Sequence, residues 1–98
     1  MDKEITEVIF RKFKPKYSYE GCDVIALFPN EAYNYNGNIL SYQTVGQHGE
    51  ADYNVVLSMS ELATKEESAK LKKELEGIGY NLKVLTRRNY KKFTSSLL

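Results

Sequence analysis

The chain has 98 residues, of which 42% are hydrophobic and 28% are charged, so it suits one globular domain and lies far from the composition of disordered chains. Its 14 Lys and Arg residues against 13 Asp and Glu residues give a formal net charge of +1, which argues against the bulk nucleic-acid affinity of strongly basic domains. One cysteine excludes an intrachain disulfide, and no apolar run is long enough to span a membrane, so we expect a cytoplasmic protein.

The first half of the chain predicts three strands. Thr6–Lys14 mixes β-branched and aromatic residues with charged ones, as a partly buried strand does. Asp23–Phe28 is a compact apolar run bounded by glycine and proline, and Ile39–Val45 alternates in the manner of a third strand. Between the second and third strands, Asn36 and Gly37 favour the positive φ angles of a tight hairpin turn.

The second half predicts a short fourth strand and one helix. Tyr53–Met59 contains a β-prone Val-Val-Leu run, so we expect a strand there. Thr64 and Glu67 have the spacing of a capping box, which places the start of a helix over Thr64–Ile78. Three apolar residues of this helix share one face, at positions i, i+4 and i+7: Leu71, Leu75 and Ile78.

The C-terminal part predicts a last strand and a tail. Tyr80–Thr86 carries the apolar residues of the final strand, residues 1–88 are expected to form a single α+β domain, and residues 89–98 a flexible basic tail. The order β-β-β-(β)-α-β favours two layers, an antiparallel sheet of four to five strands with the helix packed on one face. The other face would then serve a ligand or a second subunit, so we expect a homo-oligomer.

Four phrases of the sequence resemble segments of a known group of proteins. They are TEVIFRK at residues 6–12, VIALFP at 24–29, GQHG followed by AD at 46–52, and IGYNLKV at 78–84. Taken together, the chain resembles a family of small phage and mobile-element proteins. The resemblance covers nearly the whole chain and supplies no catalytic residues. It implies a short accessory protein that acts in the cytoplasm of an infected bacterium.

The most informative segment for function is the glycine-flanked stretch Gly46, Gln47, His48, Gly49, which is followed by Asp52. Two glycines let backbone amides approach an anion closely, and Gln47 and His48 would project polar groups from the same turn. The segment therefore predicts a site for a phosphate. The alternative is an ordinary turn between two strands with His48 merely exposed.

Aromatic and basic residues complete the predicted site. Tyr42 and Tyr53 offer flat rings with a hydrogen-bonding tip, which suit a nucleobase, and Arg11 offers a charge for a phosphate. Tyrosine is also a favoured strand residue, and basic residues are common on solvated strand edges. Both readings of these residues stay open at the level of sequence.

Catalysis is disfavoured because the parts of an active site are missing. His48 is the single histidine, a zinc site from one histidine without a cysteine pair would be unusual, and Cys22 precedes a buried strand. We therefore expect no catalytic residues, no metal and no cofactor, although a single-histidine phosphodiesterase remains an alternative.

These observations lead to a functional hypothesis with two alternatives. The leading hypothesis is a non-enzymatic accessory protein that sequesters a small phosphate-bearing nucleotide ligand, such as a host immune signal. The first alternative is a protein-interaction inhibitor that docks on a host defence enzyme. The second is a binder of single-stranded nucleic acid.

Overall fold

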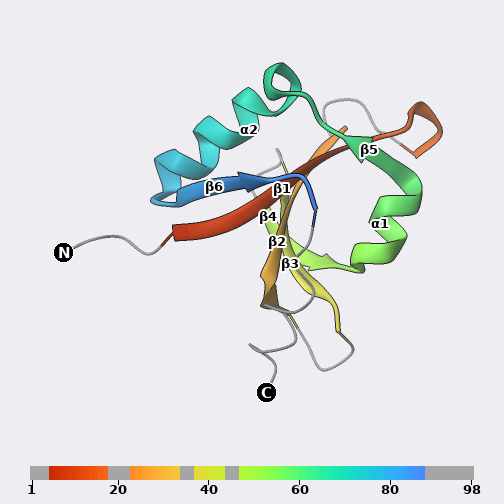
Figure 1. The fold of residues 1–98 in the computed structure, drawn as a ribbon, viewed down its shortest axis with the longest axis horizontal. Coiled ribbons are helices and arrows are strands. Elements are labelled where there is room, and N and C mark those ends of the chain that lie inside the picture. Colours follow the sequence, from red (N-terminus) through yellow and green to blue (C-terminus); the bar gives the residue numbers. More distant parts are fainter. Residues whose placement is uncertain (1–4, 18–22, 34–36, 44–46, 88–98) are drawn as a thin grey trace.

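The computed structural model describes residues 5–17, 23–33, 37–43 and 47–87, which form six strands and two α-helices (Figure 1). In chain order these elements are β1 (Ile5–Phe13), β2 (Val24–Ala32), β3 (Ile39–Gln43), β4 (Gln47–Ala51), α1 (Tyr53–Met59), β5 (Ser60–Leu62), α2 (Lys65–Ile78) and β6 (Asn81–Leu85), with a short 3-10 helix at Pro15–Tyr17. The α+β class predicted from the sequence is confirmed. The predicted tail lies outside the described residues.

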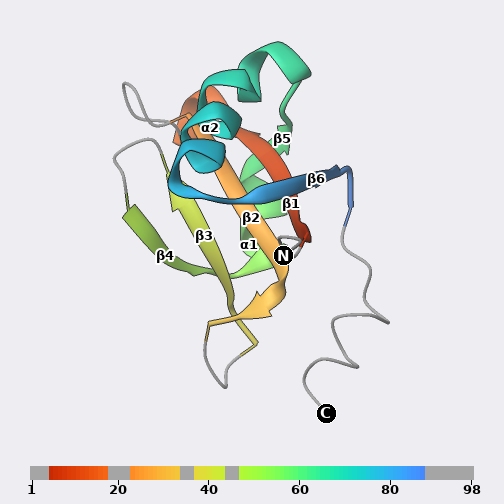
Figure 2. The same ribbon diagram turned by 90° about the vertical axis from the view of Figure 1, so that its left-hand side faces the viewer.

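The sheet is mixed, because one of its strands is parallel to its neighbour. Strands β4, β3, β2 and β1 lie side by side and antiparallel (Figure 2). The other edge of β1 is shared by two strands: β6 runs parallel beside Ile5–Ile9, and β5 runs antiparallel beside Arg11–Phe13. Helix α2 carries the chain back along β1 between these two strands. This return makes β6 parallel to β1, where the sequence predicted a purely antiparallel sheet.

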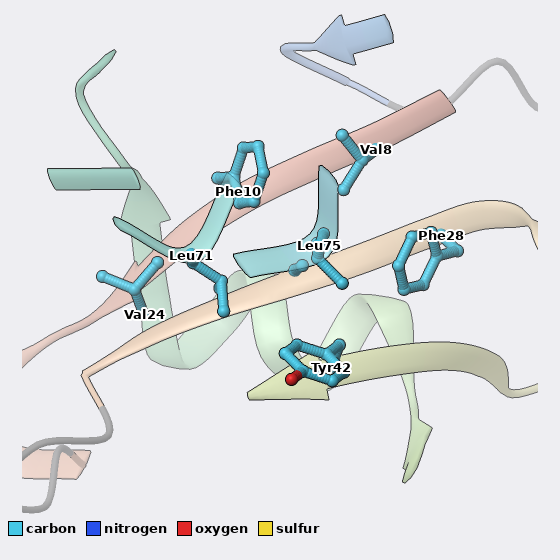
Figure 3. Packing of buried hydrophobic residues seen from close by; sticks show 8 residues of the cluster. Val8, Phe10, Val24, Phe28, Tyr42, Leu71 and Leu75 are labelled. Atoms are coloured by element: carbon cyan, nitrogen blue, oxygen red, sulfur yellow. The ribbon is translucent and has the colours of Figure 1, made fainter. Parts of the chain in front are cut away.

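The two faces of the sheet are both buried, by different helices (Figure 1). Successive strand residues alternate between the faces. On one face Val8, Phe10 and Phe28 pack under Leu71 and Leu75 of α2 (Figure 3). The opposite face holds a second cluster with α1, formed by Ile9, Ile25, Leu27, Ile39, Ala51, Tyr53 and Val56. The described part of the sheet therefore lacks the open face from which we predicted an oligomer, and the oligomer stays a prediction without that support.

The prediction of a strand at Tyr53–Met59 is wrong, because this segment is helix α1. Asp52 caps the helix, since its carboxylate accepts a hydrogen bond from the Val55 amide at 3.2 Å. Tyr53 and Val56, three residues apart, are the buried residues of the helix. A cap and an apolar i, i+3 pair thus overrode the strand propensity of the Val-Val-Leu run.

Helix α2 begins and ends as predicted. Thr64 is its N-cap and forms a complete capping box with Glu67, and Gly79 closes the helix with a φ of 126°, a conformation that favours glycine. Leu71 and Leu75 are buried, but Ile78 is 54% exposed and lies outside the core, so the predicted apolar stripe ends one turn early. No helix within the described ranges is long and apolar enough to cross a membrane.

We predict that Leu75→Ala lowers the free energy of unfolding by about 2–5 kcal/mol, because Leu75 is fully buried between α2 and the sheet. The matched control is Ile78→Ala on the same helix, which should change it by no more than about 0.5 kcal/mol. Urea denaturation of both variants measures the two values. Equal effects of the two substitutions would contradict the orientation of α2.

Candidate functional site

The segment predicted as an anion-binding turn is strand β4. Tyr42 pairs with His48 and Ser41 with Gly49, and the Ser41 hydroxyl donates to the Gly49 carbonyl at 3.1 Å. Gln47 is the first residue of this strand, opposite Gln43, whereas Gly46 lies outside the described residues. Neighbouring residues of a strand do not project from one turn. The prediction of a turn at residues 47–49 is therefore wrong, and phosphate binding by Gln47 and His48 stays a prediction.

His48 is exposed on the α2 side of the sheet and is held by aromatic neighbours. Its Nε2 lies 2.8 Å from the Tyr80 hydroxyl, and its ring meets the Tyr42 ring edge-on at a centroid distance of 4.9 Å. Tyr80 in turn stacks on Phe28 at 5.2 Å. Burial, followed by the negative charge of Glu31, raises the pKa of Tyr80. His48 thus ties β4 to the chain that follows α2.

The two tyrosines predicted to stack a ligand are core residues on opposite faces of the sheet. Tyr42 packs in the α2 cluster and donates its hydroxyl to Glu74 Oε1 at 2.5 Å, and this hydrogen bond raises the pKa of Tyr42. Tyr53 is buried in the α1 cluster. One ligand cannot lie against both rings, so the structure does not bring them together in a site.

Arg11 and Asp52 also have structural partners. The Arg11 guanidinium donates to Ser60 Oγ at 3.0 Å and to the Ser60 carbonyl at 2.7 Å, and burial lowers the pKa of Arg11. These bonds hold the end of α1 and the start of β5 against β1. Asp52, as the cap of α1, lies at the other end of that helix. The predicted site residues that the structure describes therefore do not form one pocket.

A groove of about 800 Å³ lies instead between α2, β5 and β6, within the size range of ligand sites. We call it the lysine groove. Its lining residues are Phe10, Leu62, Ala63, Lys65, Ser68, Ala69, Lys70, Lys72, Lys73, Val84, Leu85 and Thr86. The floor is mainly aliphatic, and four lysines of α2 border it.

The lysine groove exists because two strands share one edge of β1. The end of β6, where Leu85 pairs with Ile9, and the end of β5, where Leu62 pairs with Arg11, converge on either side of Phe10. The Ala63 amide donates to the Phe10 carbonyl at 3.0 Å and continues the contact beyond β5. Beyond this junction the sheet stops, which leaves Leu62 and Val84 42% and 49% exposed beside α2.

The four lysines of the groove are not used in ion pairs with the described residues. Among the described residues, none of Lys65, Lys70, Lys72 and Lys73 forms an ion pair with a carboxylate. Glu66 and Glu74 lie four residues to either side of Lys70, a spacing that allows ion pairs on a helix surface. Sequence reasoning missed the groove because its apolar wall comes from β5 and β6. The available signal was the group of lysines beside small residues Ser68 and Ala69 on one helix.

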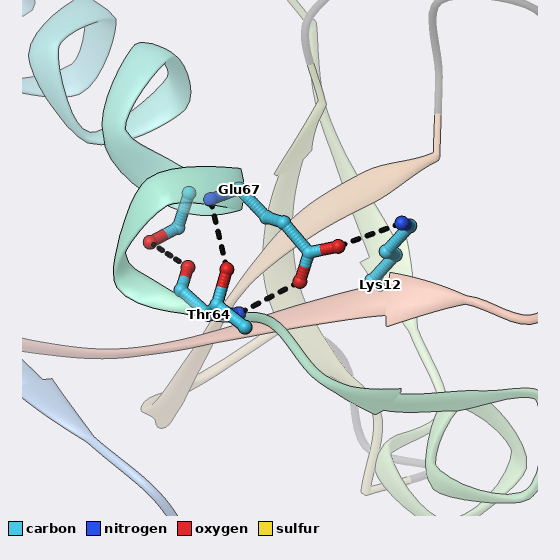
Figure 4. Close-up of polar contacts among 4 residues, drawn as sticks. Lys12, Thr64 and Glu67 are labelled. Atoms are coloured by element: carbon cyan, nitrogen blue, oxygen red, sulfur yellow. Dashed lines mark hydrogen bonds and ion pairs between the residues drawn. The ribbon is translucent and has the colours of Figure 1, made fainter.

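The N-terminus of α2, which forms one end of the groove, is fixed to the sheet by a polar cluster (Figure 4). Lys12 Nζ lies 2.6 Å from Glu67 Oε2, the Thr64 amide donates to Glu67 Oε1 at 2.9 Å, and the Glu67 amide donates to Thr64 Oγ1 at 3.1 Å. The Lys12 hydrogen bond, assisted by the Thr64 amide, lowers the pKa of Glu67 to about 2. The cluster thereby sets the position of Lys65 and Ser68.

The lysine groove presents ammonium and hydroxyl groups, and none of its lining side chains is a histidine or a carboxylate. Among its lining residues the side chains with polar groups are lysines, Ser68 and Thr86, and the Ser68 hydroxyl already donates to the Thr64 carbonyl at 3.1 Å. No group of three or more His, Cys, Asp and Glu residues suited to a metal ion occurs in the described ranges. No protein-family model, curated protein or solved structure matches the chain.

We predict that Glu67→Gln flattens the acid dependence of stability. Because the pKa of Glu67 is lowered from 4.5 to about 2, its carboxylate stabilises the fold above pH 4.5 and loses this effect as the pH falls towards 2. Glutamine keeps the capping box but removes the charge. Urea denaturation between pH 7 and pH 2 should show the two proteins converging below pH 4.5. Parallel curves over the whole range would contradict the ion pair.

Proposed function

We propose that the protein is a non-enzymatic binding protein that captures a small phosphate-bearing ligand of the nucleotide type in the lysine groove. The observation that carries the proposal is the combination of an aliphatic floor with four lysines along one wall, whose ammonium groups form no ion pair with any residue that the structure describes. An ammonium group is a mobile point charge that suits a phosphate. An apolar floor suits the face of a base or another ring.

The side chains that line the groove support ligand binding rather than catalysis. Leu62, Ala63, Val84 and Leu85 offer contact area, whereas the hydroxyl of Ser68 is engaged within α2. A general base needs a group within hydrogen-bond reach of the substrate, and none of the side chains that line the groove is a histidine or a carboxylate. Together with the resemblance to phage and mobile-element proteins, this supports sequestration of a host nucleotide signal as the biological use.

The near-neutral chain favours a small ligand over a long nucleic acid. Four lysines gather at the groove, while the formal net charge of +1 leaves little attraction of the whole chain for a polyanion. A small phosphate ester needs only the local field of the groove. The proposal therefore keeps the ligand class expected from the sequence and moves its site from β4 to α2.

We predict that Lys65→Glu and Lys72→Glu each weaken ligand binding about tenfold to a hundredfold, since a hydrogen bond to a charged group contributes about 1.5–3 kcal/mol. Isothermal calorimetry against nucleoside monophosphates, cyclic nucleotides and ADP-ribose derivatives measures this. Lys14→Glu is the matched control, because Lys14 is exposed, makes the same charge change and lies outside the groove.

A second control locates the site. His48→Ala should leave binding unchanged, because His48 contacts Tyr42 and Tyr80 and does not line the groove. The proposal fails if the unmodified protein binds no member of the panel, or if Lys14→Glu weakens binding as much as the groove variants do.

A further inference from the structure

The lysine groove gathers the positive charges of α2 and leaves out its negative ones. The helix contains four lysines and four glutamates, yet all four lysines line the groove and none of the glutamates does. Two of the glutamates have partners elsewhere, since Glu67 pairs with Lys12 and Glu74 accepts a hydrogen bond from the Tyr42 hydroxyl. The groove therefore carries a local positive charge that the nearly neutral chain does not show as a whole.

These charges suit a ligand by their number and do not impose a fixed arrangement on it. Each ammonium group ends a flexible four-carbon stem and carries three rotatable donors, so it follows an anion, unlike the rigid fork of a guanidinium group. Lys65, Lys70 and Lys73 are exposed, which leaves their stems free to move. The attraction then grows with the charge of the ligand, because each further phosphate can draw in another ammonium group.

The side chains of the groove are poorly suited to reading the edge of a base. Bases differ in where they carry amino donors and carbonyl acceptors, so telling them apart needs a protein group with a fixed role at a fixed position. The lysines are mobile, the Thr86 hydroxyl can donate or accept, and the Ser68 hydroxyl already donates to the Thr64 carbonyl. None of the lining side chains is a carboxylate, an amide or an imidazole. Leu62 and Val84 contact a flat ring without reading its edge.

We infer that the lysine groove selects its ligand by the number of phosphate charges and accepts different bases, so that nucleoside triphosphates bind more tightly than monophosphates whichever base they carry. This inference rests on the proposed function and specifies its ligand. The phosphates bind the lysines, and the base lies on the exposed side chains of Leu62 and Val84. Burial of this apolar surface stabilises the bound state of different flat rings to a similar degree.

Calorimetry on the full-length protein tests the role of charge with adenosine mono-, di- and triphosphate, in the absence of divalent cations, which would neutralise the phosphates. We expect the affinity to rise with each phosphate. The triphosphate should bind at least about tenfold tighter than the monophosphate, because hydrogen bonds to charged groups are the strong ones. Raising the ionic strength should reduce this ratio, since salt screens exposed charges.

The same measurement with the triphosphates of guanosine, cytidine and uridine tests the role of the base. Their affinities should agree with that of adenosine triphosphate within about tenfold, whereas a site that hydrogen-bonds a base edge discriminates far more strongly.

Variants separate the charged and the apolar parts of the groove. Lys65→Gln and Lys73→Gln should each narrow the ratio between triphosphate and monophosphate, and the double variant should narrow it further. Lys14→Gln, an exposed control outside the groove, should leave the ratio unchanged. Val84→Thr adds a hydroxyl to the apolar floor and should weaken adenosine triphosphate by about threefold or more, while binding of inorganic tripolyphosphate stays the same. Thermal unfolding of each variant checks that the fold is retained.

The outcomes distinguish this inference from the proposed function. If monophosphates and triphosphates bind equally, or if one base is preferred by more than about tenfold, the inference is wrong and capture of a phosphate-bearing ligand stands. The inference is also wrong if Lys14→Gln narrows the ratio as much as the groove variants do. If neither these nucleotides nor the cyclic nucleotides and ADP-ribose derivatives bind, both the inference and the proposed function fail.

Discussion

The structure depends on the division of one edge of β1 between two strands. β6 occupies the edge beside Ile5–Ile9, and β5 occupies it beside Arg11–Phe13, so the sheet is continuous on the β2 side and interrupted at Phe10 on the other. Strands that stop against each other leave side chains next to the break only partly covered. Leu62 and Val84 are partly exposed for this reason. Helix α2 lies beside them because it connects β5 to β6.

The burial of both sheet faces limits where a site can form. In a small domain the core claims most of the interior, and here Phe28, Tyr42 and Leu75 fill one face while Leu27 and Tyr53 fill the other. The polar side chains near these clusters form hydrogen bonds within the protein. Arg11 bonds to Ser60, and His48 bonds to Tyr80. The space that remains for a ligand lies at the edge of the sheet, in the lysine groove, where the lysines of α2 border partly exposed apolar side chains.

The sequence predicted elements whose determinants are local and missed those set by tertiary contacts. The capping box of Thr64 and Glu67 lies within four residues, so the start of α2 was predictable. The Val-Val-Leu run of Tyr53–Met59 favours a strand in the sequence alone, because its burial pattern appears only when Asp52 caps a helix there against the second face. The glycines on either side of His48 favour a turn, yet pairing with Tyr42 makes His48 part of a strand. The groove could not be predicted, since it joins residues 62–86 to Phe10.

The central claim is that the ligand site lies at the lysine groove and not at β4. Amide chemical-shift mapping on the isotope-labelled, full-length protein, titrated with adenosine 5′-monophosphate, tests it most directly. The predicted result is a cluster of shifted amides at Ala63, Ser68, Ala69 and residues 84–86, with His48 and Gly49 unchanged. A cluster of shifts at His48–Asp52 with an unperturbed α2 would contradict the account.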